Sequence, residues 1–133
     1  MNSRNNGALD VLTTQLVDHA GVAVVVMAGE IDMVTERSPL TTAVEALERT
    51  PLGLVVDLRD VTFFGSSGMT LLTTVQEAAR LRDVPFAVVA AHHAVRTPLA
   101  VTGMDMVLPL YADLSDALAA VGAAPAVPPQ MRR

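Results

Sequence analysis

The stretch Leu54–Arg82, LVVDLRDVTFFGSSGMTLLTTVQEAARLR, decides the fold that this sequence predicts. Its first segment, Leu54–Leu58, is rich in β-branched residues and predicts a buried strand. The segment Arg59–Gly65 then predicts a turn that carries two phenylalanines. From about Ser67 to Leu81, apolar residues recur at helical spacing and predict an amphipathic helix; they are Met69, Leu72, Val75 and Ala79.

The flanking segments extend this unit into a sheet. After a break at Asp83-Val84-Pro85, the segment Phe86–Ala90 predicts a further strand. A strand, a helix and a strand within this length imply a parallel pair joined by a right-handed crossover. Upstream, Val11–Val17 and Val22–Ala28 predict an antiparallel hairpin that turns near Gly21. The second of these strands should stop in a turn at Gly29–Asp32.

Three further helices complete the predicted order β-β-α-β-α-β-α-(β)-α. The first begins at Thr35 or at Ser38 and ends near Arg49. Pro39 would lie at the end of the first turn in one case and at the favoured first helical position in the other, and the sequence leaves both starts open. The third helix covers about Val95–Thr102, with Gly103 as its C-terminal cap. An edge strand at Val107–Leu110 and a helix at Leu114–Val121, capped by Asp113, follow. The pattern predicts one α/β domain.

The length and composition indicate how many domains the chain has and which kinds of function it does not have. The chain of 133 residues fits one domain over residues 11–122, between a flexible segment at 1–10 and a flexible Pro/Ala-rich tail at 123–133. Its net charge is −5, and its nine basic residues are all arginine without a cluster, which argues against direct nucleic-acid binding. The absence of lysine excludes a Walker-type phosphate loop and Schiff-base chemistry.

Two further absences bear on the setting in which the protein works. The chain contains no cysteine, so it has neither a disulfide framework nor a thiolate site. No apolar run approaches the ~20 residues of a membrane span, and the N-terminus shows no signal-peptide pattern. We therefore expect a cytoplasmic protein that does not enter a membrane.

Ser66 and Ser67 form the candidate site of this chain. A serine at a helix start is a favoured N-cap, so a purely structural role is the first alternative. Two features favour a functional role. The pair follows the carboxyl end of a buried parallel strand, where open α/β sheets place their ligands, and Gly65 and Gly68 leave little bulk over the hydroxyls.

Catalysis and metal binding are weaker interpretations of the same region. A hydrolase elbow requires Gly-x-Ser-x-Gly, and Met69 stands where the second glycine should be. His92 and His93 are adjacent in sequence, so their side chains diverge, and no accompanying ligand spacing predicts a metal site. Asp32, Asp57 and Asp60 lie near strand ends, where acidic turn residues are common. We expect no catalytic residue, no metal and no cofactor.

Several segments, in order along the chain, resemble the STAS domain of stand-alone bacterial anti-sigma factor antagonists over about residues 11–122. They are Gly29-Glu30-Ile31-Asp32, Val56-Asp57-Leu58-Arg59-Asp60-Val61-Thr62-Phe63, Ser66-Ser67-Gly68-Met69, Thr102-Gly103-Met104-Asp105 and Leu108-Pro109-Leu110-Tyr111. No single segment is specific, whereas the ordered set is. The resemblance implies a mixed sheet of four to five strands with the helices packed mainly on one side.

The resemblance also implies a binding switch rather than an enzyme. The unphosphorylated protein would sequester an anti-sigma factor that is an ATP-dependent serine kinase, and so release a sigma factor. The kinase would inactivate it by phosphorylating Ser66, with Ser67 as a possible secondary site, and a PP2C-type serine phosphatase would reset it. The partner-binding residues would be Asp32, Gly65, Ser66, Ser67, Gly68 and Met69.

One position departs from the family pattern. Gly65 stands where the family usually has aspartate, so a carboxylate beside the hydroxyl is missing. This departure favours an alternative function, a constitutive STAS adaptor subunit of a transport or stress-sensing complex without a working phospho-switch. A small nucleotide-binding or hydrolytic protein is a third alternative, which the missing lysine and the failed serine elbow disfavour.

Overall fold

The computed structural model describes residues 12–32 and 37–122. Its five strands are β1 (Leu12–His19), β2 (Val22–Ile31), β3 (Gly53–Phe64), β4 (Phe86–Val89) and β5 (Leu110–Tyr111). Its helices are α1 (Arg37–Glu48), α2 (Ser66–Leu81), α3 (His93–Thr102) and α4 (Leu114–Gly122), with a 3₁₀ turn at Met104–Met106. The two flexible termini and the Thr35 helix start that the sequence predicts lie outside the described residues.

The strands form one mixed sheet in the order β1-β2-β3-β4-β5. β1 pairs antiparallel with β2, and β3 pairs parallel with β4, as the sequence predicts; the β2–β3 and β4–β5 pairs are also parallel. The turn between β1 and β2 consists of Ala20 and Gly21, both with positive φ (53° and 93°). Two successive residues of this kind make the type of two-residue turn that matches the twist of a hairpin.

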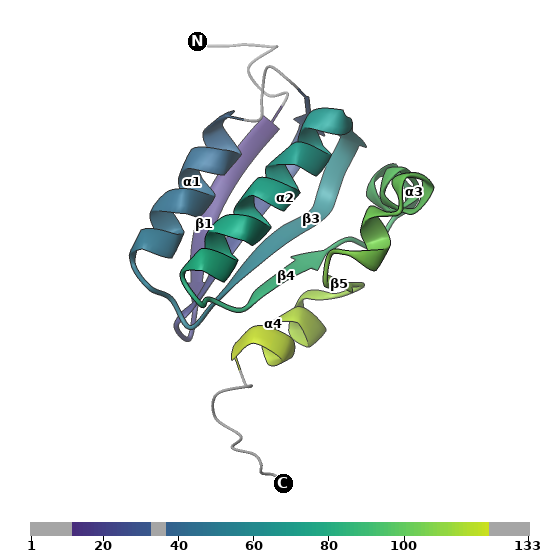
Figure 1. Cartoon of the computed structure of the whole chain (residues 1–133). Helices are drawn as coiled ribbons and strands as arrows, with labels where there is room; N and C mark the ends of the chain where they lie inside the picture. The colour runs from purple at the N-terminus through teal and green to yellow at the C-terminus, as the bar shows by residue number, and fades with distance from the viewer. Residues whose placement is uncertain (1–11, 33–36, 123–133) are drawn as a thin grey trace, which may run out of the picture.

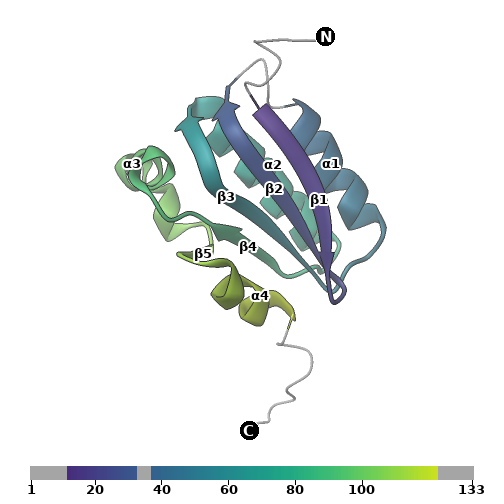
Figure 2. The same cartoon turned by 180° about the vertical axis from the view of Figure 1, so that it is seen from behind.

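Helices cover the two faces of the sheet unequally (Figures 1 and 2). On one face, α1, α2 and α3 enclose the larger hydrophobic core, whose centre includes Val25, Val56 and Leu72. On the opposite face, α4 closes a smaller core against Val24, Val55 and other strand residues. The predicted fold class is confirmed, with the helices mainly on one side and α4 alone on the other.

Two predicted turns are instead parts of strands. Gly29–Ile31 continue β2, and Arg59–Phe64 continue β3. The pairing of β2 with β3 shifts register twice, because β3 has an extra residue between the partners of Val26 and Ala28 and another between those of Gly29 and Glu30. These β-bulges place exposed polar residues within a paired strand. A bulge interrupts the alternation of buried and exposed side chains along a strand, and a turn does the same. The sequence pattern alone therefore does not distinguish the two.

The remaining differences concern boundaries. The α1 helix already includes Ser38, so Ser38 is not its N-cap and Pro39 lies in the first turn rather than at the first position. Residues 104–106 form the 3₁₀ turn, and the edge strand is shifted to Leu110–Tyr111, beyond the predicted Val107 start. Gly103 adopts the left-handed conformation (φ 78°) that the predicted C-terminal cap requires.

Candidate functional site

The candidate site lies where β2 and β3 end and α2 begins. Because the two strands are parallel, their carboxyl ends reach the same edge of the sheet, and Ile31 pairs with Phe64 there. The Gly65 N–H donates to the Ile31 carbonyl at 3.2 Å, which ties the start of α2 to the end of β2. Asp32 follows directly on Ile31. The fold therefore brings the predicted residue Asp32 to the edge that carries Gly65–Met69.

Ser66 is not the helix cap that its position suggests. The N-cap of α2 is Gly65, and no side chain caps this helix. The Gly65 carbonyl accepts the first helical hydrogen bonds, from the N–H of Gly68 at 3.0 Å and of Met69 at 3.4 Å. Ser66 is instead the first residue of the helix, and its side chain is exposed. Its hydroxyl thus has no structural role in this helix start.

The other residues of the motif are less exposed than Ser66. Ser67 and Met69 are half-buried, and Gly68 is buried. A Cβ placed on Gly68 would lie 2.6 Å from the ring of Phe64, which is itself buried. Such a separation is too short for two carbons, so Gly68 is needed for α2 to begin directly against β3. Of the two serines, the fold presents Ser66 more fully to a partner.

The backbone conformation of Gly65 does not require a glycine. Its φ of −94° and ψ of −168° are extended and open to any residue. A Cβ there would lie 3.2 Å from the ring of Phe63, which is 51% exposed. An exposed aromatic ring therefore lies beside the helix start.

A second polar cluster lies on β3, away from Ser66 in sequence. Asp57 is 3% exposed and accepts hydrogen bonds from Arg59 Nε at 3.0 Å and from Arg59 Nη2 at 2.8 Å. The backbone N–H of Arg59 also donates to Asp57 at 3.1 Å. The hydrogen bond to Asp57 raises the pKa of the Arg59 guanidinium. The Asp57 carboxylate is thus fully occupied within the chain.

The two histidines have positions that fit a structural role. His92 is the N-cap residue of α3, and its Nε2 lies 2.8 Å from the Arg59 carbonyl oxygen. The rings of His92 and His93 are 6.3 Å apart and inclined by 73°, so they do not converge on one point. Within residues 12–32 and 37–122, no group of three or more His, Asp or Glu side chains is arranged to hold a metal ion.

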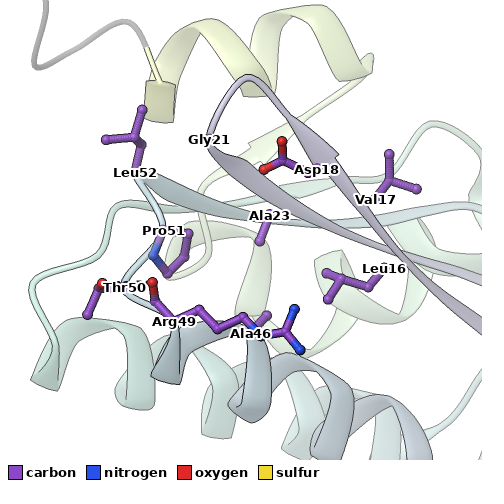
Figure 3. Close-up of a pocket in the computed structure, with 10 residues that line it drawn as sticks. All are labelled: Leu16, Val17, Asp18, Gly21, Ala23, Ala46, Arg49, Thr50, Pro51 and Leu52. Carbon is purple, nitrogen blue, oxygen red and sulfur yellow. Dashed lines mark hydrogen bonds between the residues drawn. The ribbon is translucent and has the colours of Figure 1, made fainter.

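A cavity of about 340 Å³ lies at the opposite end of the sheet (Figure 3). It is enclosed by the β1–β2 hairpin, the end of α1 and the loop before β3, with Leu16, Arg49 and Leu52 among its lining residues. Leu52 comes directly before β3, whereas Ser66 comes directly after it. The cavity is therefore separate from the Ser66 site.

In the part of the chain that the structure describes, no helix has the length and the apolar character needed to span a bilayer.

Comparison with protein families and with known proteins finds similar sequences along most of the chain. The family model described as STAS domain matches residues 13–117. The anti-sigma-F factor antagonist RsfB of Mycobacterium tuberculosis is 37% identical over 114 residues, which cover 86% of this chain and 93% of RsfB.

Solved structures of similar shape have related descriptions. An anti-sigma factor antagonist from Mycobacterium paratuberculosis superposes with a TM-score of 0.76 at 40% identity, covering 84% of this chain and 95% of that one. The unphosphorylated form of the anti-sigma factor antagonist SpoIIAA superposes with a TM-score of 0.69 at 14% identity, covering 86% of this chain and 98% of that one. At this lower identity the likeness concerns the fold alone.

Proposed function

This chain belongs to the STAS domain family, and from that premise we propose that it is an anti-sigma factor antagonist controlled at Ser66. In its unphosphorylated form it binds an anti-sigma factor that is also a serine kinase, and so frees a sigma factor. Phosphorylation of Ser66 ends this binding, and a PP2C-type serine phosphatase restores it. The similarity to RsfB over most of both chains supports the antagonist function.

The position of the Ser66 hydroxyl supports the proposed switch. It is exposed, it caps no helix, and it stands on the first residue of α2. A kinase can reach such a hydroxyl without unfolding the chain. Phosphorylation of this hydroxyl would also break none of the backbone hydrogen bonds that stabilise the helix start.

A phosphate on Ser66 should leave the fold of the chain unchanged. A phosphoserine adds about −1.5 to −2 charges and three acceptor oxygens. At the first residue of α2 these oxygens meet the positive end of the helix dipole. In the part of the chain that the structure describes, the N–H groups of Ser66 and Ser67 are also not used in hydrogen bonds. The phosphate is therefore accommodated by the antagonist itself.

Release must then arise at the interface. A partner carboxylate about 4 Å from the phosphate, at an effective dielectric constant near 20, is repelled by roughly 4 kcal/mol per unit charge. A thousandfold loss of affinity requires about 4 kcal/mol. One badly matched contact is enough to separate the proteins, and no large conformational change is required.

The protein acts in this proposal by binding and not by catalysis. Of the two histidines, His92 is engaged with the Arg59 carbonyl. The Gly-x-Ser-x-Gly spacing of a hydrolase elbow is also missing at Gly65–Met69. The exposed surface at the start of α2 is therefore the surface that binds the partner in this proposal.

Substitution of Ser66 tests the proposal. Ser66→Ala should hold the kinase permanently, whereas Ser66→Asp should lower the affinity, up to about a thousandfold for a full phosphate. Wild type, both variants and Thr74→Ala, which removes an exposed hydroxyl farther along α2, as the matched control would be used as baits for cytosol of the source cell, with bound proteins identified by mass spectrometry. Incubation of the captured complex with ATP should place phosphate on Ser66 of the wild type.

The same baits distinguish the alternative function. One partner bound equally to wild type, Ser66→Ala and Ser66→Asp, with no phosphate transferred on addition of ATP, would contradict the switch and indicate a constitutive adaptor. The Thr74→Ala control should behave as wild type, because Thr74 lies two turns farther along α2 and outside the proposed binding residues. A loss of binding in that control would show instead that the effect is not specific to the helix start.

A further inference from the structure

Among the strands of the described residues, β1 forms one edge of the sheet (Figure 2). It is eight residues long, and within residues 12–32 and 37–122 its only pairing partner is β2. The opposite edge, β5, has only two residues and directly follows Pro109. An unpaired edge strand offers a row of backbone donors and acceptors to another strand.

The strand β1 has few of the features that usually protect such an edge. Its sequence LTTQLVDH contains no proline, lysine or arginine, and Asp18 is its one acidic residue. All eight residues pair with β2 in one uninterrupted register, whereas the pairing of β2 with β3 is bulged twice. The rigid two-residue turn at Ala20 and Gly21 holds β1 in that register. The outer edge is therefore regular and complementary to a straight strand.

We propose that two copies of this chain associate through antiparallel pairing of their β1 strands, which forms one continuous sheet across the dimer. The interface is isologous, and a two-fold axis perpendicular to the sheet relates the copies. Under this symmetry both copies present α1 and α2 on the same face of the joined sheet. Residues of β1 on one face must then pair with residues on that same face of the other copy.

The side chains of β1 select a centre for this pairing. Leu16 pairs with the buried Val25 of the helix-covered core and yet remains 38% exposed. A two-fold axis at Leu16 places the two Leu16 side chains opposite each other and covers this apolar surface. In the same register Asp18 lies opposite Thr14 of the second copy, and His19 lies opposite Thr13. No two like charges meet, so the strand is complementary to itself.

The proposed dimer leaves the phosphorylation site free. Ser66 follows β3, which is separated from the β1 edge by β2. Both copies therefore keep an exposed Ser66, and dimerisation does not depend on its phosphorylation. The inference thus stands independently of the proposed function, and Ser66→Asp should dimerise as the wild type does.

Charge substitution at the centre of the strand tests the pairing. The full-length wild type should show twice the 14.0 kDa mass of one chain in light scattering coupled to gel filtration and in analytical ultracentrifugation. Leu16→Lys and Leu16→Glu should each lose the dimer, because like charges would lie directly opposite each other. An equimolar mixture of the two variants should recover it, because the charges are then opposite.

Two further variants serve as controls for the dimer test. Leu81→Lys makes the same change at a leucine that is 67% exposed at the end of α2, and it should remain dimeric. Gln15→Lys places a charge on an exposed β1 side chain that lies opposite Val17 of the second copy, where no like charge faces it, so it should weaken the dimer less than Leu16→Lys, with an unchanged circular dichroism spectrum. A wild type that sediments as one chain over a wide concentration range would overturn the proposal. Leu16→Lys and Leu16→Glu variants that each remain dimeric would also overturn it, as would an edge occupied only by a different protein.

Discussion

At the scale of single residues, the start of α2 depends on what Gly65 lacks. Gly65 is the N-cap, yet it provides no side-chain oxygen for the free N–H groups of the helix. Its extended backbone would accept another residue, and only the nearby ring of Phe63 resists a Cβ. Because Phe63 is half-exposed, its ring can turn toward solvent at little cost. The glycine is therefore not required by the fold.

We predict that Gly65→Asp is more stable than Gly65→Ala by about 1 kcal/mol. Both variants add the Cβ that meets Phe63, but only aspartate accepts a hydrogen bond from the helix N–H groups and complements the helix dipole. Urea unfolding monitored by circular dichroism would measure the difference. Equal stabilities would contradict the assignment of residue 65 as the N-cap.

At the scale of elements, α4 is a helix whose start is set by one side chain. The Asp113 carboxylate accepts hydrogen bonds from the backbone N–H of Asp116 and from the Ser115 hydroxyl, each at 2.9 Å. The hydrogen bond from the Asp116 backbone, followed by that from Ser115, lowers the pKa of Asp113. The carboxylate is thus more stable in the folded chain than in the unfolded chain.

The sign of the pH dependence follows from this lowered pKa. The capping stabilisation is present above the unfolded-state pKa of about 4 and is lost as the pH falls through the folded-state value. Asp113→Ala should lower the Tm at pH 7, and the difference from wild type should shrink below about pH 4. Asp113→Asn, which still caps but does not titrate, should keep more of the stability at pH 7.

Thermal unfolding of the three proteins between acidic and neutral pH would check this prediction. The wild type and Asp113→Ala should converge in Tm at low pH, whereas Asp113→Asn should not follow the wild type downward through this group. An Asp113→Ala difference that is the same at every pH would show that the cap acts without its charge.

At the scale of the whole molecule, the fold has two unequal cores on the two faces of one sheet. The smaller core depends on α4, whose Ala117 is fully buried and whose Val121 is 1% exposed. Gly53, the first residue of β3, would place a Cβ 2.7 Å from Val121. The helix therefore approaches the sheet closely and closes a face that would otherwise expose valines of β2, β3 and β4.

A charge placed in this smaller core should destabilise the protein, although the larger core is untouched. We predict that Ala117→Asp costs about 3–5 kcal/mol, because its carboxylate is buried without a partner. Ala119→Asp introduces the same charge two residues away on the exposed side of α4, and it should change the stability by less than about 0.5 kcal/mol. Chemical unfolding curves of both variants would measure the contrast. Equal costs would show that α4 contributes no core of its own.

The sequence by itself determined the elements and much of their order. Strands rich in β-branched residues, the helical spacing in α2 and the capping residues Gly103 and Asp113 act over a few neighbouring residues, so their physics is local. These signals predicted one α/β domain with a hairpin and parallel crossovers. They also singled out Ser66 and Ser67 at the start of α2, and the ordered motifs identified the family.

Where local sequence signals are ambiguous, only the tertiary structure decided which local structure forms. Polar residues at Arg59–Asp60 suggested a turn, but pairing with β2 stabilises a bulged strand there. Ser66 suggested a cap, but the end of β2 binds the Gly65 N–H and shifts the cap to Gly65. The second core under α4 and the open edge of β1 depend on segments far apart in sequence. Such contacts are set by packing and pairing between elements, which no short stretch of the chain contains.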